Sequence, residues 1–270
     1  MIHILQAILL GIVEGVTEFL PISSTGHLIV AEKALGYHDV QDLFTVVVQV
    51  GAIAAVVWFY RQDLTEKTVG FFKRDAAALN FWKLLVVATI PAGIIGLALD
   101  KHMQSITTPG VVATTLILGG IVLWLVDRKP VHAGNDPVEL GRITTKQALL
   151  VGLGQSVAII PGVSRSGATI VSGLALGLNR PTATAFSFYL SIPVLVLASA
   201  YKLLKYHSDI SALPGGLTAL MFGLVAAFIT ALLSISWLLR YIAHHNFKPF
   251  AYYRIALGTL IFVLLAANWL

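Results

Sequence analysis

The chain has 270 residues, of which 57% are hydrophobic and only 11% are charged, whereas ordinary soluble domains carry roughly 25% charged residues. This composition predicts an integral membrane protein. The net charge of +5 does not point to nucleic acid, because the basic residues are spread over short polar segments, as membrane topology requires. The chain has no cysteine, which excludes disulfides and thiolate catalysis.

Two apolar segments are interrupted near their middle. The first, 2–36, is broken by LPISSTGH, and the later one, 146–177, is broken by IPGVSRSG. No basic region precedes the first segment, so we expect it to belong to the mature protein. Irregular backbone at membrane depth is tolerated only inside protein or beside a water-filled cavity. Each segment therefore predicts two half-helices that enter the membrane and turn back.

Six uninterrupted apolar segments are long enough to cross a bilayer, which takes about 20 residues. In chain order they are 43–60, 82–99, 109–126, 182–201, 215–239 and 253–269. The pattern predicts an all-α membrane protein with six transmembrane helices and two re-entrant helical hairpins.

The basic residues favour one side of the membrane. The expected loops 61–83, 127–146 and 240–254, together with Arg180, hold thirteen Lys and Arg residues. The other side holds four, Lys33, Lys101, Lys202 and Lys205. The richer side should be cytoplasmic, so both termini and the first hairpin's entry should face outward.

The sequence contains an internal repeat. Residues 6–36 align with 147–177 at a constant offset of 141, with twelve identities in 31 positions. Each half is a hairpin followed by three spans, and because three is odd, the second half starts on the opposite side. We predict one membrane domain over 1–270 built from inverted repeats, 1–140 and 141–270. Sites in such folds lie near the midplane, with half-helix N-termini pointing at anions.

Two acidic residues precede the first break. Glu14 and Glu18 are four residues apart, so a helix places both on one face with Cβ atoms about 5–6 Å apart. Two like charges in a dry site repel, so one must be protonated or a cation must lie between them. We predict that the pair holds a divalent cation, Mg²⁺ or Ca²⁺, which oxygen ligands suit better than zinc. The alternative is a carboxylate pair hydrogen-bonded inside the bundle, a poor structural device.

Three hydroxyl residues, Ser23, Ser24 and Thr25, precede a new helix. Helix capping explains one hydroxyl but not three. A helix N-terminus also presents free amides that bind phosphate, and one hydroxyl could attack phosphorus if a base were near. His27 follows closely, and we expect it to be that base, although it could instead hydrogen-bond a neighbouring helix.

Arg165 occupies the second break. Its guanidinium is always charged and binds phosphate oxygens bidentately. We therefore predict that it binds an anion, a role compatible with a salt bridge to Glu14 or Glu18.

The predicted site draws on both breaks and the first full span. The catalytic candidates are Glu14, Glu18, Ser24, Thr25, His27 and Arg165. The substrate-binding candidates are Ser23, Ser24, Thr25, Gly26, Gln49, Ser164, Arg165, Ser166 and Gly167. For Gln49, a hydrogen bond between helices is the simpler explanation.

The stretches EGVTEFLPISSTGH and PGVSRSGATI resemble the two signature regions of bacterial undecaprenyl-diphosphatases of the BacA type. Length and hydropathy fit that family over essentially the whole chain. The resemblance carries over an acidic pair, a hydroxyl–histidine group and a phosphate-binding arginine. In this sequence they are Glu14 and Glu18, then Ser24, Thr25 and His27, and finally Arg165.

The resemblance implies an enzyme of the bacterial inner membrane that hydrolyses undecaprenyl diphosphate to undecaprenyl phosphate and inorganic phosphate. This reaction recycles the lipid carrier of cell-wall peptidoglycan synthesis, depends on a divalent cation and confers bacitracin resistance. We expect the polyprenyl tail to lie between spans in the membrane lipid and the site to be open to the periplasmic face. A homodimer is expected only as a general habit of membrane enzymes.

A second class of function fits the same architecture. Inverted repeats with broken helices are also the plan of secondary transporters, so the chain could instead move a phosphate-bearing polyprenyl lipid across the bilayer. A binding site alone does not require a histidine beside a serine, and this favours the enzyme.

Overall fold

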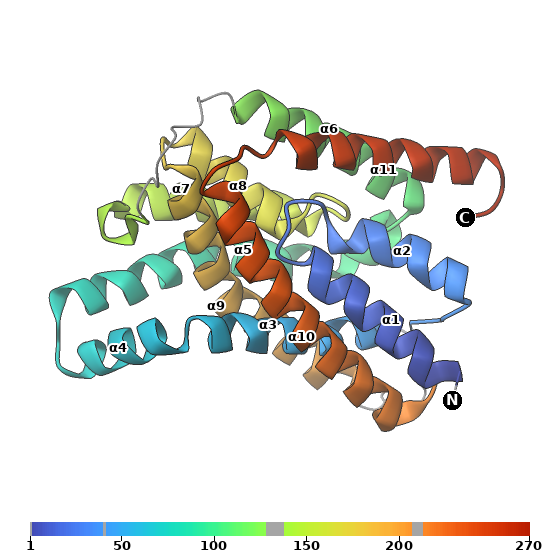
Figure 1. Ribbon diagram of the computed structural model, residues 1–270, viewed down its shortest axis with the longest axis horizontal. Coiled ribbons are helices and arrows are strands. Elements are labelled where there is room, and N and C mark those ends of the chain that lie inside the picture. The colour runs from blue at the N-terminus through green and yellow to red at the C-terminus, as the bar shows by residue number, and fades with distance from the viewer. Residues whose placement is uncertain (1, 40–41, 128–137, 207–212) are drawn as a thin grey trace.

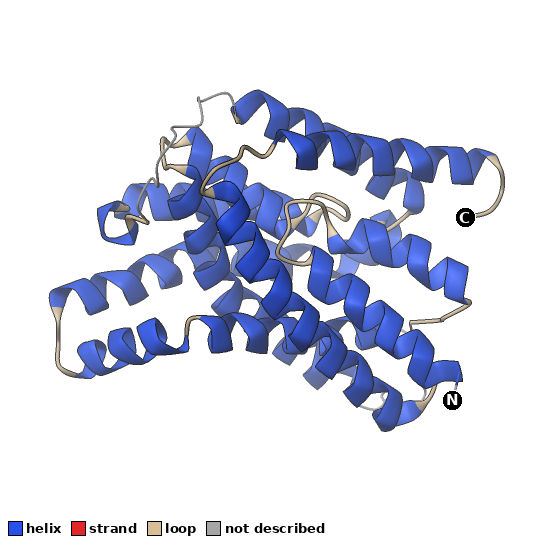
Figure 2. Cartoon of the chain, viewed as in Figure 1, coloured by secondary structure: helices blue, strands red, loops and turns tan. Residues whose placement is uncertain are grey.

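The computed structural model describes residues 2–39, 42–127, 138–206 and 213–270, without the side chains of 101–105. All regular structure in this part of the chain is helical (Figure 2). The helices are α1 (Ile2–Thr17), α2 (Ser24–Leu35), α3 (Leu43–Phe59), α4 (Arg61–Phe72), α5 (Ala76–Ile106), α6 (Pro109–Val126), α7 (Thr145–Ser156), α8 (Arg165–Ala175), α9 (Arg180–Tyr206), α10 (Gly216–Ile242) and α11 (Lys248–Ala266). Single 3₁₀ turns, η2 (Leu140–Arg142) and η3 (Val157–Ile159), flank α7.

Five of these helices, α5, α6, α9, α10 and α11, are long and apolar enough to cross a membrane. They correspond to five of the six predicted spans. Large apolar side chains are exposed on them, for example Ile94, Leu197 and Leu233, as on a protein surrounded by lipid. The fold is consistent with the predicted class, an all-α integral membrane protein.

The sixth predicted span, 43–60, ends where the structure has a sharp bend. It corresponds to α3, which bends by 75° into α4 at Tyr60. The predicted loop 61–83 is therefore wrong, since α4 and the start of α5 lie side by side as an arm (Figure 1). We expected a loop because the segment is polar, but a helix outside the apolar layer needs no apolar sequence.

Two arginines counted on the basic side are buried. The expected loop 240–254 is wrong, because α10 runs to Ile242 and α11 begins at Lys248, so that Arg254 lies within α11 and is 1% exposed. Arg180 starts α9 and is also buried. The bias of basic residues toward one side persists without these two. Two others counted there, Arg128 and Lys129, lie outside the described residues.

Each hairpin packs against the opposite half of the chain. Helix α1 packs on α10, and α7 packs on α5, while α6 lies along α11 (Figure 1). Glycines allow the close approach, because a β-carbon at Gly11 would collide with the carbonyl of Gly223, and one at Gly152 with the carbonyl of Ala88. Each hairpin thus rests against a long helix from the other half of the chain.

The same hydrogen bond closes both hairpins. The Gln6 side-chain amide donates to the carbonyl oxygen of Leu35 at 2.7 Å, and that of Gln147 donates to the carbonyl oxygen of Leu176 at 3.2 Å. The two glutamines are 141 residues apart in the sequence, and so are the two leucines. This is the offset of the repeat. The sequence similarity of the two segments is therefore matched by their local structure.

A buried ion pair ties three helix ends together. Asp127, which follows α6, accepts hydrogen bonds from Arg180 Nε at 2.7 Å and from the backbone amide of Phe247, which precedes α11. The carboxylate is 1% and the guanidinium side chain 9% exposed. Buried charges need such partners, because their desolvation is otherwise not offset.

We expect Asp127→Asn to lower the free energy of unfolding by about 3–5 kcal/mol, because it leaves the buried guanidinium without its counter-charge. Thermal unfolding in detergent would record the loss as a fall in Tm. Asp42→Asn is the matched control, since it breaks an exposed pair with Lys202 and should cost less than about 1 kcal/mol. Equal losses in the two variants would contradict this assignment.

Candidate active site

The first break runs from the end of α1 to the start of α2. The amide of Glu18 still donates to the carbonyl oxygen of Glu14 at 2.9 Å, so the two acids keep their helical spacing. Pro21 has no amide to continue the ladder. Ser23 then adopts a φ of 71° and precedes α2. The break therefore carries two acids at its entry and a fresh helix N-terminus at its exit.

The second break has the same exit. Ser164 precedes α8 with a φ of 71° and a ψ of 115°, compared with 71° and 102° at Ser23. A positive φ is uncommon for a residue with a side chain, and the two serines occupy equivalent positions of the repeat. The residue after each serine begins the outgoing helix, so the repeat places Ser24 and Arg165 equivalently.

The two breaks meet in the interior of the protein. Arg165 Nη2 donates to Glu18 Oε1 at 2.9 Å, and both side chains are nearly buried. Beside this pair, the hydroxyl of Ser166 donates to the carbonyl oxygen of Leu20 at 2.8 Å. The structure therefore brings the acidic end of the first break against the basic end of the second.

Glu18 joins the guanidinium to a serine. The hydroxyl of Ser24 donates to Glu18 Oε2 at 2.8 Å, while Oε1 accepts from Arg165. The guanidinium also donates to the carbonyl oxygen of Ser187 at 3.2 Å and lies over the ring of Phe19. The Glu18 carboxylate thus accepts from Arg165 through one oxygen and from the hydroxyl of Ser24 through the other.

The expected contact between His27 and Ser24 is absent. His27 Nδ1 bonds to the carbonyl oxygen of Ser23 at 2.7 Å, and Nε2 lies 2.8 Å from the hydroxyl of Tyr253. A carbonyl only accepts, so Nδ1 carries the proton and Nε2 accepts from the tyrosine. The ring turns back to the start of its own helix and bonds to α11, the alternative the sequence left open, and its role as the base stays a prediction. The acceptor at Ser24 is Glu18.

The remaining predicted site residues differ in exposure and in role. Thr25 is exposed and Gln49 is half-buried, facing Glu14. Ser164 caps α8 by accepting from the amide of Gly167 at 3.1 Å. Gly26 serves close packing, because a β-carbon there would lie 2.8 Å from the side chain of Leu116.

Several buried polar atoms at this centre have no hydrogen-bond partner. They are both carboxylate oxygens of Glu14, the hydroxyl of Ser23 and Nε of Arg165. No side chain caps the N-terminus of α2, so its first amides are also available. Unpaired buried polar groups are rare in native proteins. Their concentration around one ion pair indicates a place for a polar ligand that carries both acceptors and charge.

The site can supply two carboxylates to a metal ion. Within the described residues, no group of three or more His, Asp or Glu side chains could hold one. Mg²⁺ is nevertheless commonly bound by one or two carboxylates together with substrate phosphates. The unpaired oxygens of Glu14 and the neighbouring Glu18 fit that mode if a phosphate supplies further ligands.

Helix α11 contributes two residues that sequence reasoning missed, Tyr253 and Arg254. A signal for them was present. Pro249 lies in the first turn of α11, a position that proline favours. It would have started the helix early enough to place Arg254 inside the protein rather than in a loop.

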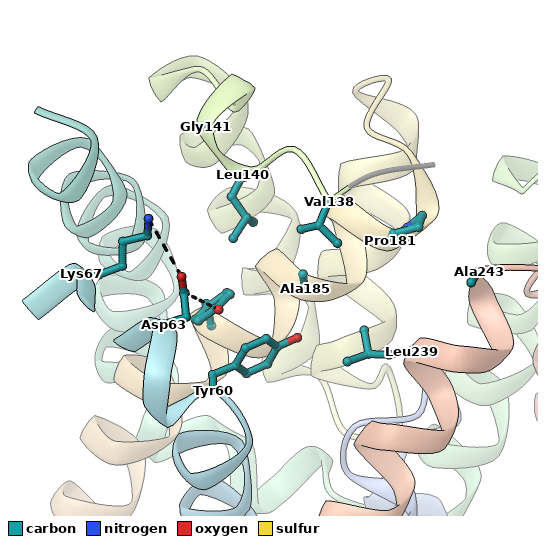
Figure 3. Close-up of a pocket in the computed structure, with 11 residues that line it drawn as sticks. Tyr60, Asp63, Lys67, Val138, Leu140, Gly141, Pro181, Ala185, Leu239 and Ala243 are labelled. Carbon is teal, nitrogen blue, oxygen red and sulfur yellow. Dashed lines mark hydrogen bonds and ion pairs between the residues drawn. The ribbon is translucent and has the colours of Figure 1, made fainter. Parts of the chain in front are cut away.

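A cavity of about 640 Å³ lies elsewhere, at the bend between α3 and α4 (Figure 3). Its lining includes Tyr60, Asp63, Lys67 and Tyr189, and it contains none of the predicted site residues. The hydroxyl of Tyr189 donates to Asp63, which also faces Lys67. Asp63, Lys67 and Tyr189 are thus paired with one another, so the cavity is a weaker candidate site than the two breaks.

Comparison with known proteins identifies the family. The family model described as "Bacitracin resistance protein BacA" matches residues 7–260. The chain belongs to the BacA family. BacA relatives named undecaprenyl-diphosphatase include those of Dechloromonas aromatica, 44% identical over 99% of this chain and 97% of the relative, and Polaromonas sp., 46% identical over 98% and 95%. The one from Neisseria gonorrhoeae is 39% identical over 99% and 97%. The resemblance read from the two motifs is confirmed.

Proposed function

We propose that this chain hydrolyses undecaprenyl diphosphate to undecaprenyl phosphate and inorganic phosphate at the meeting point of the two breaks. The names of its relatives support the reaction. The observation that carries the site is the part-buried Arg165–Glu18–Ser24 chain beside the unpaired oxygens of Glu14. The reaction would return the lipid carrier to peptidoglycan synthesis, in keeping with a family named for bacitracin resistance.

Substrate binding in this proposal uses fixed positive groups. The free Nε of Arg165 and the uncapped amides of α2 would bind the diphosphate, since helix N-termini and guanidinium groups both favour phosphate. Ser23 has a free hydroxyl to add a hydrogen bond. Groups fixed in place before the reaction stabilise charge as it develops on the transferred phosphoryl group.

The chemical step uses Glu18 as the proton acceptor. Ser24 donates its proton to Glu18 as its oxygen attacks the terminal phosphorus, and the bond from that phosphorus to the bridging oxygen breaks. Water then attacks the same phosphorus, the bond from phosphorus to the serine oxygen breaks, and Glu18 returns the proton to Ser24 as phosphate leaves. In a variant of this step, Ser24 orients a water molecule that attacks directly. Thr25 could replace Ser24 only after moving inward from its exposed position, and His27 could carry a proton through Nε2 only by leaving Tyr253.

The proposal includes a divalent cation. Glu14 and Glu18 are the residues that would hold Mg²⁺ or Ca²⁺, which supplies positive charge to the phosphate oxygens.

We further propose that the fold is a pair of inverted repeats with six spans, the sixth being α3. The exchanged packing of α1 on α10 and α7 on α5 and the matching closure of both hairpins support this arrangement. The hairpins would be re-entrant in the bacterial inner membrane, with the site open to the periplasm. The homodimer stays a prediction.

We expect purified protein in detergent to release orthophosphate from a polyprenyl diphosphate. Glu18→Gln and Arg165→Ala should each reduce the rate by roughly 10²-fold or more, because they remove the proton acceptor and the anion-binding charge. Glu66→Gln and Arg142→Ala are matched controls at exposed positions and should keep the rate.

The same protein in vesicles separates the enzyme from the alternative transporter. Lipid movement without phosphate release would contradict the proposed function, whereas both activities together would indicate a hydrolase that also moves its product. Trapping a phosphoserine at Ser24 would distinguish attack by the serine from attack by water.

The orientation can be tested because the chain has no cysteine. Lys33→Cys and Lys73→Cys each place one thiol at an exposed position. We expect a membrane-impermeant thiol reagent to label the first in intact cells and the second only after lysis, because basic segments stay inside. Labelling of both from the same side would contradict the proposed topology.

A further inference from the structure

Arg254 lies between the two breaks and binds the backbone of both. Its guanidinium donates to the carbonyl oxygen of Pro21 in the first break at 3.2 Å. It donates to those of Gly162 and Val163 in the second break at 3.3 and 2.9 Å. Two further bonds, to the carbonyl oxygens of Thr115 and Leu116, hold it against α6.

These partners explain why an arginine is needed at this depth. In a break, the backbone carbonyl groups lack the hydrogen bonds that a helix would give them. A bilayer interior has no water that could donate those bonds instead. One planar guanidinium with five N–H donors can satisfy carbonyls from several directions at once. The lysine ammonium carries three donors from one atom and cannot reproduce that fork.

The charge of Arg254 is unusual in its surroundings. The hydrogen-bond partners recorded for its side chain are all carbonyl oxygens, and no carboxylate in the described part of the chain pairs with it. A buried charge without a counter-ion is costly. The group also touches the start of α8, because a β-carbon at Gly167 would lie 3.0 Å from Nη1. A buried guanidinium without a counter-ion, placed at the contact between the breaks, indicates a role in the site.

We propose that Arg254 is a positioning residue that holds the two breaks at the separation required by the Arg165–Glu18 contact. It touches neither Glu18 nor Ser24 in the contacts described and acts through the backbone that carries them. The expected effect on kcat rests on the proposed function, whereas the bridge between the breaks is a structural property that does not. Removing the bridge lets the guanidinium of Arg165 and the carboxylate of Glu18 separate, which slows the chemical step while the protein stays folded.

The test uses Arg254→Lys, which keeps the charge, and Arg180→Lys as the matched control, a buried arginine at a helix end outside the site. At a temperature well below both melting points, we expect Arg254→Lys to lower kcat about tenfold or more with KM changed less than threefold, a loss typical of displaced catalytic groups. Arg180→Lys should lower Tm by a similar amount and keep kcat within about twofold.

A second readout does not depend on activity. Ser23→Cys introduces a single thiol at a residue that is 2% exposed. We expect Arg254→Lys to accelerate its reaction with a thiol reagent about tenfold, and Arg180→Lys to leave the rate unchanged. Equal labelling in both backgrounds would overturn the bridge, whether or not the chain hydrolyses diphosphate. Faster labelling without a change in kcat would overturn the positioning role and leave the bridge intact.

Discussion

The structure depends on one ion pair between Arg165 and Glu18, two residues 147 positions apart in the chain, and this pair joins the two interrupted segments. Each charge would be costly alone in an apolar interior, and each makes the other tolerable. The pair also requires the two breaks to reach the same place. The packing of α1 on α10 and α7 on α5 brings them there, and Arg254 holds their carbonyl groups together.

The two halves use one backbone design for different chemistry. Ser23 and Ser164 share a left-handed conformation before an outgoing helix. The next position then carries a hydroxyl in the first half and a guanidinium in the second, Ser24 and Arg165. Glu14 is likewise replaced by Gln155, whose buried amide atoms also lack partners. A site of this kind arises when repeats keep their geometry and exchange only side chains.

Much of this could be predicted from the sequence, because apolar length, interruption and charge are strong signals in a membrane protein. The two breaks and Arg165 were recognised since proline, serine and a charge are costly inside an apolar segment. Helix α4 was missed because polar sequence outside the apolar layer is ambiguous. Arg254 was missed because a charge near the end of a span looks like a loop. The direction of His27 depends on side-chain torsions, which spacing alone does not determine.

A double-mutant cycle on Glu18 and Arg165 tests the central ion pair most directly. Unfolding free energies would be measured for Glu18→Gln, Arg165→Gln and the double variant in detergent. If the side chains touch as described, the double variant loses less than the sum of the single losses, with a coupling of about 0.5–3 kcal/mol. Losses that add within about 0.5 kcal/mol, as for distant residues, would show that the two breaks do not meet at this pair.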